Sequence, residues 1–445
     1  MVQKYLSIAL LLLICSAFSA QSNSPIIPKP TLLQSNENVF SYSNGLDVKI
    51  LRGNENTKRL QKELSDFLKG RDITIVPYSS TTISLNLLSN KDIDLPADGY
   101  KLIITPSSIA ITSTGNAGLF YGVQSLKQLF YATLTQKLDC VEIKDTPAFS
   151  FRGMHLDVAH QFFTIDVVKK YLDAMAKLKL NQFHWQLSDG KNCKLKINSQ
   201  PFLTDTTNFY TQEEIKSIVK YAQERFISII PEIYIPAVSA QNPLSKNYQL
   251  IDELSALFPG EYVQIGNSIT DDSTLAYWKQ KGKKIIGNDK ITTPNETIVS
   301  YKNSKSGFSL AAKGVEVIMA TRQYCSLDYY QDWEDEKKSF NMQFLPLEKS
   351  YSFKPTGKIK DTTTLKHILG GQAFLYSNYI KNEGDLDYQA FPRLIALAEC
   401  FWTKSDSKKF DDFESRLKLL KNYFYFEKEL PKIDLVRFKP QKEQQ

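Results

Sequence analysis

The spacing of hydrophobic residues changes near residue 148. Beyond this point, short apolar runs typical of buried strands alternate with stretches that have helical spacing. The expected strands share an apolar core bounded by polar residues or glycine, and they are "RGMHLDVA", "LNQFHWQLS", "FISIIPEIYIP", "EYVQIGN", "KKIIGND", "ETIVSYK", "VEVIMATRQYC" and "ILGGQAFLYS". Eight strand–helix alternations over about 280 residues predict an α/β fold, a (β/α)8 TIM barrel, in residues 149–430.

The helices expected between these strands have recognisable ends. The segment "TQEEIKSIVKYAQERF" opens with Thr211 and has Glu214 three residues later, which is the pattern of a capping box. The last barrel helix is expected over "DYQAFPRLIALAECFW", and residues 431–445 are expected to form a tail. The segment between the fourth and fifth strands, "SITDDSTLAYWKQKG", has room for one helix only.

Residues 21–148 have the mixed spacing of a small α+β domain. "LDVKILR" alternates as a strand, "ENTKRLQKELSDFLKG" has helical spacing, and two further strands flank "TPSS" as a hairpin. A second helix is expected over "AGLFYGVQSLKQLFYAT". No acidic residues or histidines converge in this domain, so we expect it to support the barrel.

Composition and charge exclude some classes of protein. The chain has 445 residues, of which 42% are hydrophobic and 23% charged, so it can bury a large core. Its formal net charge of +7 is spread along the sequence, and its densest basic clusters alternate with apolar or acidic residues. This distribution favours a solvated surface, and we expect no nucleic-acid partner.

The potential metal-binding residues show no ligand spacing. The cysteines beyond the amino terminus are widely scattered, at Cys140, Cys193, Cys325 and Cys400, and we expect buried free thiols. The chain has only four histidines. We therefore expect neither a metal nor an organic cofactor.

The amino terminus has the pattern of a signal peptide. Lys4 precedes "LSIALLLLICSAFSA", an apolar run followed by small residues, so residues 1–20 are expected to be cleaved and the protein exported to the periplasm or outside the cell. A lipoprotein anchored at Cys15 is the alternative, but the bulky Ile14 stands where lipoprotein processing favours a small residue. No later stretch is long enough for a membrane span.

The first two barrel strands carry residues suited to sugar recognition. "FRGMHLDV" places Arg152 at the mouth or the floor of the barrel, with Asp157 five residues later. "FHWQLSDG" places His184, Trp185 and Asp189 at or near a strand end. Charged groups hydrogen-bond sugar hydroxyls and aromatic rings contact the C–H face of a sugar, although His184 and Trp185 are equally compatible with a role in the core.

Several long segments resemble the family 20 glycoside hydrolases, the β-N-acetylhexosaminidases. These segments are "RGMHLDVAHQFFTIDVVKKYLDAMAKLKLNQFHWQLSD", "LFPGEYVQIG", "LPLEKSYSF", "HILGGQAFLY" and "AFPRLIALAE". "GYKLIITPSSIAITSTGNAGLFYGVQSLKQL" is similar to the small domain that precedes the barrel in that family. The resemblance runs through nearly the whole chain after the signal peptide.

The resemblance implies a catalytic aspartate–glutamate pair after strand 4, and this pair is missing. In the family, the substrate's acetamido oxygen attacks the anomeric carbon, the aspartate orients that amide, and the glutamate protonates the leaving oxygen. The family motif is His-x-Gly-Gly-Asp-Glu, and the matching stretch here is "QIGNSI". Gln264 replaces the histidine, Asn267 the second glycine, Ser268 the aspartate and Ile269 the glutamate.

Other positions that frame the sugar in the family also differ. Ser326 stands for a tyrosine that would bind the acetamido oxygen. The remaining departures are on separate strands: Tyr376 and Asn378 after strand 8, Asn288 and Tyr301 in place of tryptophans, Tyr234 and Val238 after strand 3, and Asp189-Gly190 for a double aspartate. Because these changes converge on one pocket, a misaligned register does not explain them.

We therefore expect an exported β-N-acetylhexosaminidase-like protein that has lost hydrolysis and binds N-acetylhexosamine glycans or a protein partner. The alternative is an active glycosidase with a relocated acid, for which Asp272 is the candidate. If sugar binding remains, the expected binding residues are Arg152, His184, Trp185, Asp189, Tyr301, Asp328, Tyr376 and Asn378. Asp157 and Glu232 are expected to maintain the shape of the barrel.

Overall fold

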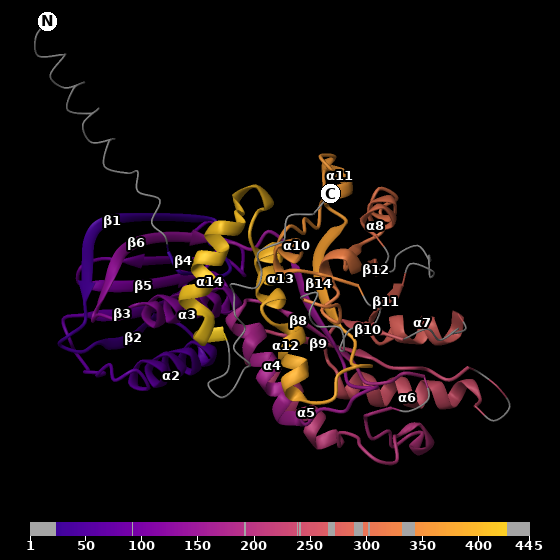
Figure 1. Cartoon of the computed structure of the whole chain (residues 1–445). Coiled ribbons are helices and arrows are strands. Elements are labelled where there is room, and N and C mark those ends of the chain that lie inside the picture. The colour runs from indigo at the N-terminus through magenta and orange to yellow at the C-terminus, as the bar shows by residue number, and fades with distance from the viewer. Residues whose placement is uncertain are drawn as a thin grey trace, which may run out of the picture. The chain divides into compact units, whose positions relative to one another are not determined.

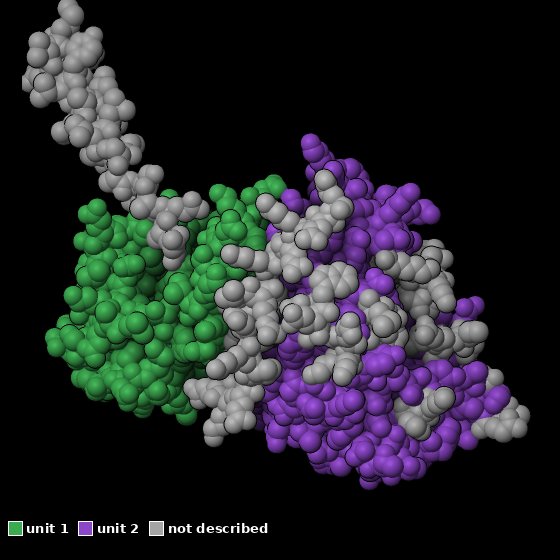
Figure 2. All heavy atoms as spheres, in the orientation of Figure 1, with its two compact units in different colours: residues 1–147, 406–425 green, residues 148–405, 426–445 purple. Residues whose placement is uncertain are grey.

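The computed structural model divides into two compact units, Met1–Pro147 with Asp406–Tyr425 and Ala148–Ser405 with Phe426–Gln445 (Figure 2). The residues described are 24–90, 92–190, 193–237, 239, 242–265, 272–288, 297–300, 303–331 and 343–424. Within them, no helix is long and apolar enough to cross a membrane.

The first unit is built on a six-stranded mixed sheet with two helices from the same part of the sequence (Figure 1). Its elements are β1 (Leu32–Ser41), β2 (Asp47–Arg52), α2 (Glu55–Lys69), β3 (Thr82–Leu87), β4 (Tyr100–Ile104), β5 (Ser108–Ser113), α3 (Asn116–Ala132) and β6 (Lys137–Asp145). The strand order is β1-β6-β4-β5-β3-β2, and the expected hairpin is confirmed because β4 and β5 pair antiparallel. Strands β1 and β6 were not expected. In β1, polar residues dominate "LLQSNENVFS" and most positions are exposed.

The second unit is a closed barrel of eight parallel strands, which confirms the fold expected from the hydrophobic spacing (Figure 1). The strands are β7 (Phe151–Asp157), β8 (Gln182–Gln186), β9 (Ser228–Glu232), β10 (Tyr262–Gln264), β11 (Lys284–Asn288), β12 (Thr297–Ser300), β13 (Val317–Met319) and β14 (Ile368–Leu375). Strand β14 closes the barrel on β7. Each expected strand overlaps one of these, so the sequence predicted their number and order.

Helices follow the barrel strands in sequence, as in other (β/α)8 barrels. They are α4 (Ile165–Lys177), α5 (Gln212–Gln223), α6 (Leu244–Leu257), α7 (Asp272–Gln280), α8 (Ser304–Ala311), α9 (Arg322–Cys325), α10 (Leu347–Tyr351), α11 (Thr362–Leu365), α12 (Glu383–Ala390) and α13 (Arg393–Trp402), with short 3-10 turns at Pro201–Leu203 and Ser405–Ser407. The capping box that opens α5 is confirmed, because Thr211 and Glu214 each accept from the other's backbone N–H.

Two expectations about the end of the chain need correction. The last barrel helix is not continuous: α12 ends at Ala390 and α13 begins after Pro392, because proline has no N–H to donate and disfavours helical geometry in the residue before it. Helix α14 (Phe410–Phe424) was assigned to the barrel from its position in the sequence, but it packs on α3 and belongs to the first unit.

Close packing where the barrel closes depends on a glycine. Gly370 on β14 has a φ of +146°, and a Cβ there would collide with the carbonyl oxygen of Phe151 on β7. Only glycine fits both the conformation and the space. All four cysteines in the described residues are buried and free, as expected.

Candidate functional site

The carboxyl ends of the barrel strands form one mouth, where active sites of this architecture are found. Strand β10 is the fourth strand, and its last residue, Gln264, is paired with Glu232 at the end of β9. Ser268 and Ile269 follow β10, but they and Tyr301 lie outside the described residues.

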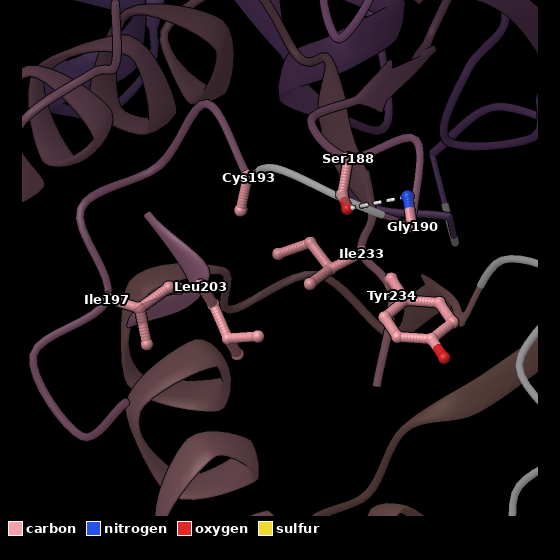
Figure 3. A pocket seen from close by; sticks show the side chains of 7 residues that line it. All are labelled: Ser188, Gly190, Cys193, Ile197, Leu203, Ile233 and Tyr234. Atoms are coloured by element: carbon pink, nitrogen blue, oxygen red, sulfur yellow. Dashed lines mark hydrogen bonds between the residues drawn. The ribbon is translucent and has the colours of Figure 1, made fainter. Parts of the chain in front are cut away.

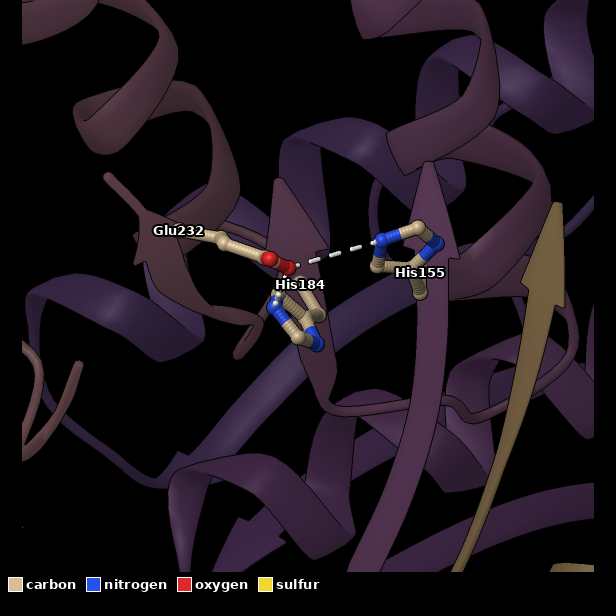
Figure 4. Close-up of side chains that lie close together, drawn as sticks. All are labelled: His155, His184 and Glu232. Carbon is tan, nitrogen blue, oxygen red and sulfur yellow. Dashed lines mark ion pairs between the residues drawn. The ribbon is translucent and has the colours of Figure 1, made fainter. Parts of the chain in front are cut away.

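Two imidazoles and one carboxylate meet inside the barrel just below the mouth. His155, His184 and Glu232 come from the adjacent strands β7, β8 and β9, and their side chains converge (Figure 4). Glu232 Oε2 lies 3.0 Å from His184 Nε2 and 3.7 Å from His155 Nε2. The two imidazole centroids are 4.8 Å apart with their planes nearly perpendicular.

Glutamine side chains surround this cluster. His155 Nε2 lies 3.1 Å from Gln186 Oε1, and His184 Nδ1 lies 3.1 Å from Gln372 Nε2. Burial by itself would raise the pKa of Glu232, but the imidazoles of His155 and His184 outweigh it and lower the pKa to about 2. Burial lowers the pKa of His184. At neutral pH the cluster therefore combines an ionised carboxylate with a neutral His184.

A second histidine–carboxylate pair lies at the end of β7. His160 Nδ1 is 2.6 Å from Asp157 Oδ2, and the backbone N–H groups of Ala159, His160 and Ser377 donate to the same carboxylate. Asp157 is fully buried, whereas the side chain of His160 is 34% exposed. These bonds hold the end of β7 to the loop after β14, which fits the scaffold role expected for Asp157.

This pair should make stability depend on pH. The hydrogen bond to Asp157 raises the pKa of His160, although burial of the imidazole opposes this. Burial favours a higher pKa for Asp157, but the interactions with His160 outweigh it and the pKa of Asp157 is lowered. The histidine contribution is complete below its unfolded pKa of about 6.5 and is lost as pH rises through the raised value. The aspartate contribution is complete above about pH 3.9 and is lost as pH falls through the lowered value.

We therefore expect the free energy of unfolding of the wild type minus that of His160→Gln to be largest near pH 5–6 and to fall between pH 7 and 9. Urea unfolding at a series of pH values measures this difference. His367→Gln is the matched control, because His367 forms no ion pair within the described chain. A difference for His160→Gln that does not change with pH would contradict the assignment.

Asp328 lies in the segment that follows β13. It is 3% exposed; Ser326 Oγ donates to its Oδ1 at 2.6 Å, while Oδ2 has no hydrogen-bond partner in the described residues. Burial raises the pKa of Asp328, against the hydrogen bond from Ser326. The Tyr376 ring is 5.1 Å from His155, and burial raises the pKa of its hydroxyl.

Arg152 is not at the mouth. It is the second residue of β7 and is fully buried at the amino end of the strand, which is the floor of the barrel. Nε donates to Lys179 O at 2.9 Å and Nη1 to Phe149 O at 2.8 Å, and the guanidinium lies over the Trp402 ring. The guanidinium is thus used to hold backbone carbonyls, and its assignment to sugar binding is corrected.

Trp185 is also unsuited to binding sugar. Because it alternates with the inward-facing His184, its ring is directed away from the barrel interior, is fully buried, and packs 4.8 Å from the ring of Tyr210. Three other expected residues are exposed: Asp189 after β8, Asn378 after β14, and Asp272 at the first position of α7. The structure therefore brings His184, Tyr376 and Asp328 towards the mouth and separates them from Arg152 and Trp185.

A small hollow beside β8 and β9 is lined by two positions that differ from the family, Gly190 and Tyr234 (Figure 3). Its lining residues come from the segments after these strands: Ser188, Gly190, Cys193, Ile197, Leu203, Ile233 and Tyr234. Gly190 has a φ of +95°, and a Cβ there would be 3.6 Å from the Tyr234 ring. The cavity of about 10 Å³ holds one water molecule at most, so it is no sugar site.

Sequence reasoning missed His155 and His160. Both lie in "MHLDVAH", and period-2 alternation would have placed His155 on the same face of β7 as Asp157. The proximity of His155 and His184 follows from the parallel register, in which their Cα atoms are direct partners.

Comparison with known proteins identifies the origin of this architecture. The model of the Glycosyl hydrolase family 20 catalytic domain matches residues 149–251 and 267–405, and that of family 20 domain 2 matches residues 23–146. The chain belongs to glycoside hydrolase family 20. The first unit therefore corresponds to domain 2 of the family together with α14.

The family members most similar in sequence include bacterial hexosaminidases. A β-hexosaminidase of Porphyromonas gingivalis is 29% identical over 91% of this chain, but the match spans only 65% of that protein's length. A β-N-acetylhexosaminidase of Cellulomonas fimi is 26% identical over 88% of this chain and 92% of the relative.

Solved structures of family 20 share the fold. The exo-β-N-acetylglucosaminidase from Vibrio harveyi, crystallised with N-acetylglucosamine, has a TM-score of 0.78 at 26% identity and covers 91% of this chain and 77% of its own. The β-N-acetylhexosaminidase from Streptomyces coelicolor A3(2) has a TM-score of 0.78 at 22% identity, over 91% of this chain and 96% of its own, which supports the fold alone.

Proposed function

We propose that this chain is an exported, non-hydrolysing member of family 20 that binds glycans containing N-acetylhexosamine at the mouth of its barrel. The observation that carries the proposal is the sequence after β10, where Ser268 and Ile269 stand at the positions of the catalytic aspartate and glutamate. A hydroxymethyl group and a butyl group cannot orient an acetamide by charge or protonate a leaving oxygen.

Two of the described carboxylates near the mouth, those of Asp157 and Glu232, have lowered pKa values and are poorly suited to act as a general acid. Asp157 is fixed by three backbone N–H groups and His160. Glu232 is ionised between two imidazoles. Asp328 Oδ2 is buried and has no hydrogen-bond partner in the described residues, so we infer that a sugar hydroxyl would satisfy it.

Isothermal titration calorimetry of the mature chain with N-acetylglucosamine and chitobiose tests the binding. We expect dissociation constants in the millimolar range or below, and a loss of about 10-fold in Asp328→Ala, which corresponds to one hydrogen bond to a polar group. Asp94→Ala, which removes an exposed carboxylate of the first unit, is the control and should bind as the wild type does. Absence of binding to the wild type at millimolar sugar would contradict the glycan and leave a protein partner.

Export is the second part of the proposal and rests on residues 1–20. The mass of the protein recovered from its host should correspond to a chain that begins near Gln21. A mass that includes residues 1–20 would contradict export by signal cleavage.

A further inference from the structure

We propose that the chain binds one divalent transition-metal ion, with Zn²⁺ as the reference case, between His155, His184 and Glu232. Two imidazole nitrogens and one carboxylate oxygen are a donor set that zinc and its neighbours in the first transition row accept, with positions left for water or a further ligand. The expectation of no metal rested on sequence spacing, and the barrel brings these three residues together regardless of that spacing.

The strand register places the donors on one face. His155 and His184 are direct Cα partners on β7 and β8. Glu232 on β9 is the partner of Gln186, two positions beyond His184, so it points to the same side as His184. All three side chains therefore enter the barrel interior, with the carboxylate facing both rings (Figure 4).

The separations suit coordination after a small adjustment. Bonds to zinc are about 2.0–2.2 Å for nitrogen and oxygen, so tetrahedral donor atoms lie about 3.3 Å apart. Glu232 Oε2 is 3.0 Å from His184 Nε2 and 3.7 Å from His155 Nε2, and all the donor atoms lie within 4.8 Å of one another.

Hydrogen bonds within the described chain leave this cluster incompletely satisfied. His184 Nε2 is close to the carboxylate, but the direction of its N–H does not form a hydrogen bond with it, and this buried atom has no other partner in the described residues. Gln372 Oε1 is also buried without a described partner. Buried polar atoms without partners are rare, and a cation would use the lone pair of His184 Nε2.

Gln372 provides the supporting interaction expected behind a metal-bound histidine. When Nε2 binds the ion, Nδ1 carries the proton and donates to an oxygen. The Gln372 amide lies 3.1 Å from His184 Nδ1, and turning it end for end presents Oε1 to that N–H. With the amide turned in this way, Gln372 Oε1 accepts from His184 Nδ1–H, and His184 Nε2 is left to bind the ion.

The accessible side of the cluster is the carboxylate. The side chain of Glu232 is 14% exposed, whereas that of His184 is fully buried. An ion arriving from solvent would therefore meet the carboxylate of Glu232 before the two imidazoles.

The test uses the full mature chain, stripped with a chelator and titrated with Zn²⁺ by calorimetry and with Co²⁺ by visible absorption. We expect one ion per chain and visible Co²⁺ bands from nitrogen coordination. His184→Gln and His155→Gln should each weaken binding at least about 100-fold, more than loss of a supporting residue typically does. His367→Gln, which makes the same chemical change outside the cluster, should bind as the wild type does.

Two further measurements test the proposal even if the histidine variants fail to fold. Gln372→Leu leaves the three donors intact and should weaken binding by about 10–100-fold. Zn²⁺ should also raise the midpoint of thermal unfolding of the wild type, and a chelator should reverse the rise. A wild-type chain that binds neither Zn²⁺ nor Co²⁺ at millimolar concentration, or equal binding by the wild type, Gln372→Leu and His184→Gln, would overturn the proposal.

Discussion

Purified mature protein is expected to release no detectable 4-nitrophenol from 4-nitrophenyl N-acetyl-β-D-glucosaminide in an ordinary assay. A general acid contributes about 10²–10⁴-fold to such a reaction, and a preorganised group that stabilises charge contributes about 10²–10³-fold. Ser268 and Ile269 remove both contributions, and Ser326 removes a further expected donor. Even if these losses are not additive, a rate at least about 10⁴-fold below that of an active family member is expected.

The assay needs high protein concentration, an active hexosaminidase as positive control and two variants. Asp272→Asn tests the relocated acid, which the structure places in an exposed position at the start of α7. The double variant Ser268→Asp with Ile269→Glu should raise the rate above that of the wild type if the two positions correspond to the catalytic pair. Ordinary turnover by the wild type, abolished in Asp272→Asn, would establish an active glycosidase instead.

Arg152→Met is expected to destabilise the barrel by about 3 kcal/mol or more. The substitution keeps much of the apolar stem but removes the donor to the buried carbonyl of Lys179 and to the partly buried carbonyl of Phe149, and loss of a partner costs a buried group about 1–3 kcal/mol. It also removes the contact between the guanidinium and the Trp402 ring.

Urea unfolding followed by tryptophan fluorescence measures this effect in the barrel alone. All the tryptophans belong to the second unit: Trp185, Trp278, Trp333 and Trp402. Lys284→Met, an exposed cation on β11, is the control and should change stability by no more than about 0.5 kcal/mol. If Arg152→Met kept full stability and lost sugar affinity instead, the guanidinium would be a ligand of the sugar and its placement at the floor would be wrong.

The hydrolysis assay and the unfolding of Arg152→Met test two different roles of residues in this fold, catalysis and stability. The proposed loss of hydrolysis concerns the residues after β10, whereas the stability of the barrel depends on buried groups such as Arg152 and Asp157 that hold strand ends. A member of the family can therefore lose its catalytic pair and still fold, because the two sets of residues do not overlap.

The sequence predicted the barrel well because its signals are local. Each strand is a short apolar run, and the Thr211–Glu214 capping box is contained within four residues. The break between α12 and α13 could also have been predicted, since Pro392 was visible within the expected helix. The exposed, polar β1 gave no such signal because its position is set by pairing with β6, about a hundred residues away.

Residue roles were less predictable than elements. Arg152 and His184 were both expected to bind sugar, but Arg152 lies near the start of β7 and His184 in the middle of β8. The position of a residue along its strand decides whether it lies at the floor or towards the mouth. His155 was overlooked because its role depends on His184, its direct partner on the neighbouring strand, and this pairing is not visible in the sequence. Helix α14 was assigned by sequence order, although its apolar face packs on α3.

By itself, the sequence determined that this chain forms an eight-stranded barrel with a small preceding domain, and that a hydroxyl and an alkane follow the fourth strand. Both conclusions depend on hydrophobic spacing and residue chemistry that are readable over a few positions. Only the tertiary structure decided that His155, His184 and Glu232 meet and that Arg152 is sealed in the floor. These facts arise from strand register and barrel closure, which bring residues distant in sequence within a few ångströms of one another.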